Sequence, residues 1–123
     1  METPKVVIDT NVVIAGAINP RGSSGKVLEH VASHAIISFT SPLLLKELEL
    51  KLYHRKVLKY LGDRMYADIV LSMFKSTSIV IFSSRRFNIA RDPRDNELFN
   101  VAFESGAEYI ISLDKKTCSF AAR

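Results

Sequence analysis

Short, nearly continuous apolar runs occur four times along the chain, and longer segments with helical spacing separate them. Such runs are typical of β-strands that are buried on both faces. They cover residues 5–9, 35–39, 78–82 and 109–113. Strands that alternate with helices predict a parallel sheet with right-handed crossovers. We expect one α/β domain over residues 1–123, because a second independent core would not fit into this length.

Apolar residues three and four positions apart, together with polar capping residues, predict the helices. Their expected ranges are 11–17, 23–32, 42–52, 56–61, 63–76 and 92–104. Ser23 and Ser41 are the expected N-caps of two of them, and Pro42 follows at a position where its missing N–H does no harm. The expected inward-facing side of the helix at 63–76 consists of Ile69, Val70, Met73 and Phe74.

Composition narrows the class of protein. With 47% hydrophobic and 24% charged residues, the chain resembles an ordinary soluble domain, and no apolar run is long enough for a membrane span. The residues after Met1 show no signal-peptide pattern. A single cysteine, Cys118, excludes an internal disulfide framework and a thiolate metal cluster. We therefore expect a cytoplasmic protein.

The net charge of +4 is only weak support for a nucleic-acid partner, because a solvated basic surface explains it equally well. It gains weight if four acids belong to one metal site. Nine acidic residues would then remain against 17 basic ones. A polyanion would meet a positive surface with one negative pocket, which a bound divalent cation would partly neutralise.

Three aspartates are expected at one edge of the sheet. Asp9 ends the first strand, Asp114 ends the fourth, and Asp95 lies in the first turn of the helix before that strand. Ligands of parallel α/β sheets gather outside the carboxyl ends of the strands, where the amino ends of the helices also lie. Each acid has a structural alternative: Asp9 as a helix cap, Asp92 with Asp95 as a capping box, and Asp114 as a turn residue. Three acids packed together would repel one another without a cation.

A fourth acid is less well defined by pattern. Glu47 and Glu49 both border the apolar face of their helix, and spacing does not choose between them. An acidic cluster of this kind suits Mg²⁺ or Mn²⁺, which prefer oxygen ligands. Such an ion can activate a water molecule and stabilise charge on an attacked phosphate. The chemistry needs no histidine, and His30, His34 and His54 are expected at or near the surface.

Four motifs together resemble the PIN-domain family. They are Val-Val-Ile-Asp-Thr-Asn-Val-Val at 6–13, Ser-Pro-Leu-Leu-Leu-Lys-Glu-Leu at 41–48, Asp-Pro-Arg-Asp-Asn at 92–96, and Tyr-Ile-Ile-Ser-Leu-Asp at 109–114. The resemblance covers essentially the whole chain, in order and with fitting spacing. It selects Glu47 over Glu49.

The resemblance implies a three-layer α/β/α fold with a parallel sheet of four strands in the order 3-2-1-4. The family commonly adds a further short strand at the sheet edge, but residues 117–123 offer no good strand, so we expect a fifth strand here to be short or missing. It also implies hydrolysis of RNA phosphodiester bonds with Mg²⁺ or Mn²⁺. The implied catalytic and metal-binding residues are Asp9, Glu47, Asp95 and Asp114. Thr10 and Asn11 would support the site, Asn96 would contact the substrate or support the site, and Asp92 would be an accessory acid or a cap.

The implied partners follow from the same likeness. The chain is similar to the toxins of prokaryotic toxin–antitoxin pairs, which implies a homodimer and an antitoxin protein that covers the active edge. Arginines in or beside the loop before the helix at 92–104 would contact the backbone of a single-stranded RNA without specifying its sequence. These are Arg85, Arg86, Arg91 and Arg94. If residues 109–113 form an exposed edge strand, that edge would favour pairing with another chain.

Other classes fit less well. A receiver domain needs adjacent acids near the first strand, where this chain has Asp9 alone. A phosphatase with an aspartyl nucleophile needs a second aspartate two residues later, where Asn11 stands. The remaining alternative is an RNA- or protein-binding module on the same fold with little catalysis, which metal-dependent turnover would distinguish from a nuclease.

Overall fold

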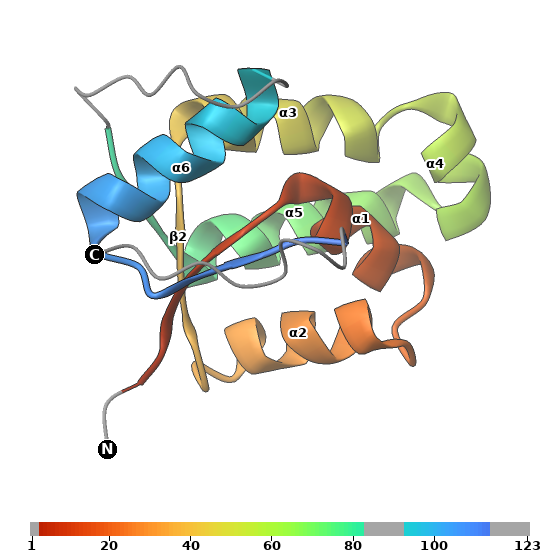
Figure 1. Ribbon diagram of the computed structural model, residues 1–123. Coiled ribbons are helices and arrows are strands. Elements are labelled where there is room, and N and C mark those ends of the chain that lie inside the picture. Colours follow the sequence, from red (N-terminus) through yellow and green to blue (C-terminus); the bar gives the residue numbers. More distant parts are fainter. Residues whose placement is uncertain (1–2, 83–92, 114–123) are drawn as a thin grey trace.

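The computed structural model describes residues 3–82 and 93–113, for which Figure 1 shows the arrangement of helices and strands. The described residues form four strands and six helices. In chain order these are β1 (Lys5–Ile8), α1 (Thr10–Ile18), α2 (Ser23–Ala32), β2 (Ile37–Thr40), α3 (Pro42–Leu52), α4 (Arg55–Leu61), α5 (Arg64–Thr77), β3 (Ser78–Val80), α6 (Pro93–Ser105) and β4 (Tyr109–Ile111). Within these residues, none of the helices is both long and apolar enough to cross a membrane.

The four strands form one parallel sheet in the order β3-β2-β1-β4. Val7 pairs with Phe39 on one side and with Ile110 on the other, so β1 is a central strand. The parallel sheet and the order 3-2-1-4 confirm the expected fold class. Every carboxyl end of a strand therefore lies at the same edge of the sheet, which is called the carboxyl edge below.

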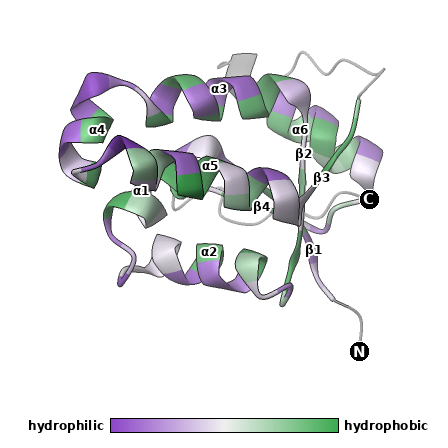
Figure 2. Cartoon of the chain, turned by 180° about the vertical axis from the view of Figure 1, so that it is seen from behind, coloured by the Kyte–Doolittle hydropathy of each residue, from purple (hydrophilic) through white to green (hydrophobic). Residues whose placement is uncertain are grey.

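Helices pack against both faces of the sheet and enclose two hydrophobic cores. Successive residues of β1 alternate between them: Val6 and Ile8 belong to one core, and Val7 belongs to the other. The first core is formed with α1, α2, α3 and α5, and the second with α6. Figure 2 shows hydrophobic residues along the central strands and both hydrophobic and hydrophilic stretches on the helices, as expected for amphipathic helices.

Helix α3 contributes to both cores. Leu44 packs in the core beneath α6, whereas Leu48 and Leu52 pack in the core on the other face. All three side chains are nearly inaccessible, with at most 2% of their surface exposed. The helix is therefore fixed along its length, and the polar residues between these leucines are held in defined positions.

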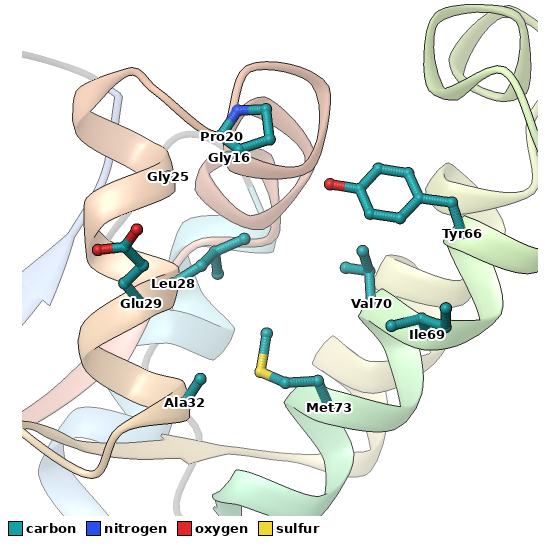
Figure 3. A pocket seen from close by; sticks show the side chains of 10 residues that line it. All are labelled: Gly16, Pro20, Gly25, Leu28, Glu29, Ala32, Tyr66, Ile69, Val70 and Met73. Carbon is teal, nitrogen blue, oxygen red and sulfur yellow. The ribbon is translucent and has the colours of Figure 1, made fainter.

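The amino end of α2 packs tightly against the turn that joins it to α1. A Cβ atom at Gly25 would lie 2.1 Å from the carbonyl oxygen of Pro20, so only glycine fits there. Next to this contact, α1, α2 and α5 border a mostly apolar hollow of ≈ 250 Å³ (Figure 3). Its lining includes Leu28, Tyr66, Ile69 and Met73, and it contains none of the candidate acids.

Two expectations about α5 and α2 are wrong in detail. Val70 and Phe74 are buried as expected, but Ile69 is 58% exposed, because Ala67 and Leu71 complete the buried side of α5. Ser23 is the first residue of α2 and not its N-cap; Gly22 takes the capping position without a side-chain hydrogen bond.

The second strand begins later than its apolar run suggests. The backbone N–H groups of Ala35 and Ile36 both donate to the carbonyl of His30, which closes the end of α2. His34 adopts a left-handed conformation in this turn (φ 64°). The strand therefore starts at Ile37 and extends to Thr40. The third and fourth strands are likewise shorter than expected and end at Val80 and Ile111.

Candidate active site

The carboxyl ends of the two central strands lead directly into helices. Asp9 lies between β1 and α1, and Ser41 lies between β2 and α3. The amino end of α6 lies at the same edge, because the hydroxyl of Ser41 donates to Oε2 of Glu97 in α6 (2.6 Å). Three segments that are distant in sequence thus meet at the carboxyl edge.

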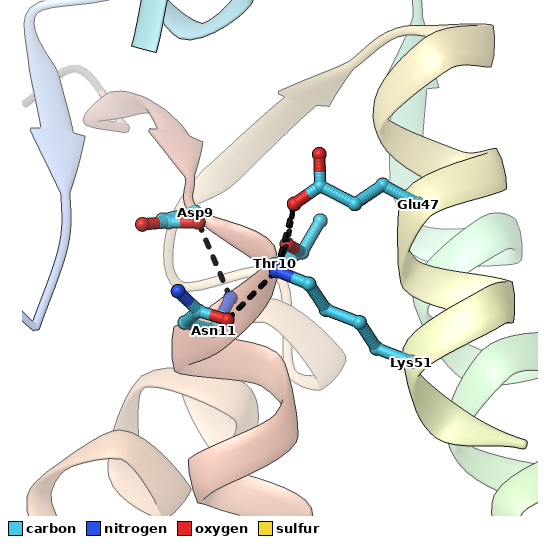
Figure 4. Close-up of polar contacts among 5 residues, drawn as sticks. All are labelled: Asp9, Thr10, Asn11, Glu47 and Lys51. Atoms are coloured by element: carbon cyan, nitrogen blue, oxygen red, sulfur yellow. Dashed lines mark hydrogen bonds and ion pairs between the residues drawn. The ribbon is translucent and has the colours of Figure 1, made fainter. Parts of the chain in front are cut away.

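Asp9 is the N-cap of α1. Its Oδ1 accepts a hydrogen bond from the backbone N–H of Asn11 (3.2 Å), and its own N–H donates to the carbonyl of Ile111 in β4 (2.9 Å). Asp9 therefore caps α1, which was the structural alternative for this residue. Capping does not exclude a second role, because a carboxylate has two oxygens and about four acceptor positions. Figure 4 shows this carboxylate turned toward the side on which β4 lies.

Glu47 reaches the start of α1 from the second turn of α3. The hydroxyl of Thr10 donates to Oε2 of Glu47 (2.6 Å), and Thr10 itself is only 2% exposed. Glu49, two residues further along α3, is exposed. The acid selected by the family resemblance is thus the one that faces α1.

Lys51 joins the same group of side chains from one turn further along α3. Its ammonium donates to Oε2 of Glu47 (2.8 Å), to Oδ1 of Asn11 (2.8 Å) and to Oγ1 of Thr10 (3.1 Å). Figure 4 shows these contacts together with Asp9. We refer to Thr10, Asn11, Glu47 and Lys51 as the Glu47–Lys51 cluster.

Several predicted site residues lie outside the described part of the chain. These are Arg85, Arg86, Arg91, Asp92 and Asp114. Asp95 and Arg94 are placed by their backbone in the first turn of α6, and their side chains are outside the described residues. Asn96 is half-buried in the same turn. The amino end of α6, and with it the backbone of Asp95, therefore lies at the edge that carries Asp9 and Glu47.

The oxygen atoms of this edge fit a hard divalent cation. Asp9 and Glu47 supply carboxylate oxygens, and the cluster contains no thiolate or imidazole, whereas the side-chain oxygens of Thr10 and Asn11 already accept hydrogen bonds from Lys51. Over residues 3–82 and 93–113, no group of three or more His, Cys, Asp or Glu could by itself hold a metal ion. A complete ligand set would need Asp95 or Asp114 in addition.

Two features of the site were not predicted from the sequence. Lys51 is four residues after Glu47, which is the spacing and order of a favourable helix ion pair, so the signal was present. Glu97 lies four residues before Val101 on the inward side of α6 and is only 8% exposed. An acid on the apolar side of a helix indicates a buried partner, which is the hydroxyl of Ser41.

The three histidines do not belong to the Glu47–Lys51 cluster. His30, His34 and His54 are exposed, as expected. His54 is the N-cap of α4, where Nδ1 accepts the backbone N–H of Lys56 (3.2 Å). The described geometry therefore gives none of them a place among the acids.

Comparison with known proteins gives a consistent assignment. A family model described as PIN domain matches residues 5–116, a span that contains all four candidate acids. An uncharacterized protein of Methanocaldococcus jannaschii is 44% identical over 115 residues, which cover 94% of this chain and 74% of that protein. No solved structure shows a significant match.

Proposed function

This chain belongs to the PIN domain family, and from that premise we propose that it is a metal-dependent endoribonuclease. PIN domains are generally nucleases and commonly use divalent metal ions. The proposed site consists of Asp9, Glu47, Asp95 and Asp114 with Mg²⁺ or Mn²⁺. When bound, such an ion activates a water molecule and stabilises the charge that develops on the phosphate.

Two hydrogen bonds at the carboxyl edge carry this proposal. Ser41 connects the amino end of α6 to the amino end of α3, while Thr10 connects α1 to Glu47. The segments that bear three of the four acids are thereby fixed at one edge of the sheet. Helix amino ends at this edge also favour ionised acids and phosphate groups through their dipoles.

The chain's own residues have distinguishable roles in this proposal. Asp9 stays fixed by the N–H of Asn11 and offers its remaining acceptor positions to a cation. Thr10 orients Glu47 through its hydroxyl. The basic residues Arg85, Arg86, Arg91 and Arg94 would hold the phosphates of a single-stranded RNA beside these acids.

The biological setting is part of the proposal. We infer a toxin of a toxin–antitoxin pair that acts in the cytoplasm as a homodimer and is inhibited by an antitoxin. Its resemblance to such toxins supports this. Co-purification with the product of a neighbouring gene, and loss of RNA cleavage in that complex, would test it.

The decisive experiment compares two aspartates that share a structural role. Asp9 and Asp63 are both N-caps that accept a backbone N–H two residues later. Since asparagine caps a helix about as well as aspartate, neither Asp9→Asn nor Asp63→Asn should unfold the protein. We expect Asp9→Asn to lower cleavage of a single-stranded RNA pool by orders of magnitude, because a metal ligand is lost. Asp63→Asn should cleave like the parent protein.

The metal-ion conditions show whether cleavage depends on a divalent cation. Cleavage is measured with Mg²⁺, with Mn²⁺ and with a chelator. Cleavage that survives in chelator, or an Asp9→Asn protein as active as Asp63→Asn, would contradict the proposed mechanism. A parent protein that binds RNA but does not cleave it under any condition would identify the chain as a binding module.

A further inference from the structure

The ammonium group of Lys51 is surrounded like a bound cation. It has three N–H donors, and the structure gives it three oxygen acceptors, from Glu47, Asn11 and Thr10. The acceptors come from two different helices. A carboxylate, an amide and a hydroxyl oxygen are also the ligand types that Mg²⁺ takes from proteins.

The Glu47–Lys51 pair differs from an ordinary surface ion pair. The side chains of Lys51 and Glu47 are 27% and 20% exposed, and the hydroxyl between them belongs to the buried Thr10. An exposed helix pair of this spacing is mobile and screened by water and salt. Here the second helix restricts both side chains, so the positive charge stays at one position.

We propose that Lys51 permanently fills the cation position beside Glu47, so that the site takes up a single divalent ion on the Asp9 side. The inference rests on the proposed function and refines it. Glu47 then acts at the site as the charge partner of Lys51 and not as a metal ligand. Lys51 is a positioning residue in this arrangement.

Electrostatics supports the assignment. In sites with two metal ions, the ions lie about 3.5–4 Å apart and share acidic ligands. A second divalent ion at Glu47 would have to displace an ammonium that has three hydrogen bonds there. On its other side, Lys51 borders an open hollow of ≈ 360 Å³ formed by Asn11, Ile14, Leu50, Lys51, His54 and Val57. These lining residues include no acid that would draw the ammonium away.

The carboxylates of Asp9 and Glu47 face different sides of the candidate site. Its carboxylate is turned toward the side of β4, whereas Glu47 approaches Thr10 from α3 (Figure 4). The residue after β1 and the end of β4 are joined by the hydrogen bond from Asp9 to Ile111. The carboxylate of Asp9 therefore points away from the position that the ammonium of Lys51 occupies.

The test counts ions directly. RNA-free protein is titrated with Mn²⁺, and the bound ion is measured by electron paramagnetic resonance. We expect a single bound ion for the parent protein and a second one for Lys51→Met, because this change leaves Glu47 without the ammonium. Lys46→Met removes the same charge from an exposed position of the same helix and should bind a single ion.

Three further variants separate positioning from a purely structural role. Glu47→Gln should keep the single ion, whereas Asp9→Asn should lose it. Lys51→Arg retains a cation and should also bind a single ion, which keeps the proposal testable if Lys51→Met does not fold.

The outcomes distinguish this inference from the proposed function. Two ions in the parent protein, or loss of the ion in Glu47→Gln, would overturn the role of Lys51 while metal-dependent RNA cleavage could still be observed. A Lys51→Met protein that folds and binds only a single ion would also overturn it. A parent protein that neither binds Mn²⁺ nor cleaves RNA would overturn both.

Discussion

At the scale of single residues, one hydroxyl group connects two helices of the candidate site. Thr10 donates to Glu47 and accepts from Lys51, and its side chain is almost completely buried. A methyl group in its place would remove one hydrogen bond from the carboxylate of Glu47 and one from the ammonium of Lys51, although these two groups would still contact each other. A hydrogen bond to a charged group contributes more than one between neutral groups, so the loss of both should lower stability measurably.

This reasoning predicts different effects for two small changes at Thr10. Thr10→Val keeps the shape and removes the hydroxyl, so we expect a loss of about 1–3 kcal/mol in the free energy of unfolding. Thr10→Ser keeps the hydroxyl and should lose less. Chemical denaturation of the metal-free proteins measures both. Equal stability of the two variants would show that the hydroxyl contributes little.

Sequence reasoning is reliable for some residues of the site and not for others. The position of Asp9 after a buried strand could be predicted, since the apolar run and the following small residues define that strand end. The choice of Glu47 over Glu49 could not be made from spacing and came from the family resemblance. In the structure Glu47 accepts a hydrogen bond from Thr10 of α1, whereas Glu49 is exposed, a difference that depends on how α3 packs against α1.

At the scale of elements, α3 is anchored at both ends. Ser41 caps its amino end, accepts the N–H of Leu44 (3.2 Å) and donates to Glu97. At the other end, the hydroxyl of Tyr53 donates to Asp68 of α5, and this hydrogen bond raises the pKa of Tyr53 above its ordinary value. These contacts at both ends of α3 fix the positions of Glu47 and Lys51 relative to α1.

The amino-terminal anchor gives an element-scale prediction. Ser41→Ala removes the N-cap of α3 and the donor to the buried carboxylate of Glu97. We expect the free energy of unfolding to fall by about 2–4 kcal/mol, the sum of a lost cap and an unpaired buried acid. Ser76→Ala removes an exposed hydroxyl that donates to a backbone carbonyl, and it should change stability by less than about 0.5 kcal/mol. Thermal or urea unfolding compares them, and similar losses would contradict the anchoring role.

The boundaries of elements show why sequence patterns fall short. Ala35 and Ile36 are apolar residues in a strand-like run, yet their backbone N–H groups donate to the carbonyl of His30 at the end of α2. Ile69 is a large apolar residue of the kind found in cores, yet its side chain is mostly exposed and borders the hollow of Figure 3. In both cases an apolar residue has two available environments, and tertiary packing selects one of them.

At the scale of the whole molecule, the parallel α/β class follows from the alternation of strands and helices, but the strand order does not. Several orders satisfy short, right-handed connections. The order β3-β2-β1-β4 was implied by the family motifs, and the structure shows it. That order places β1 in the centre, which sets Asp9 between the carboxyl ends of β2 and β4.

The charge of the molecule gives the last prediction. If Arg85 and Arg86 contact RNA phosphates at the carboxyl edge, replacing both with alanine should weaken binding to all sequences and lower the slope of log affinity against log salt by about one to two. Lys5 and Lys75 are exposed, at the start of β1 and in the last turn of α5 before β3, so they lie at the opposite edge. Replacing them with alanine removes the same charge and should leave the slope nearly unchanged. Fluorescence anisotropy of labelled single-stranded RNA in chelator measures both. Equal slopes for the two double variants would mean that net charge, and not a path across the acidic edge, attracts the RNA.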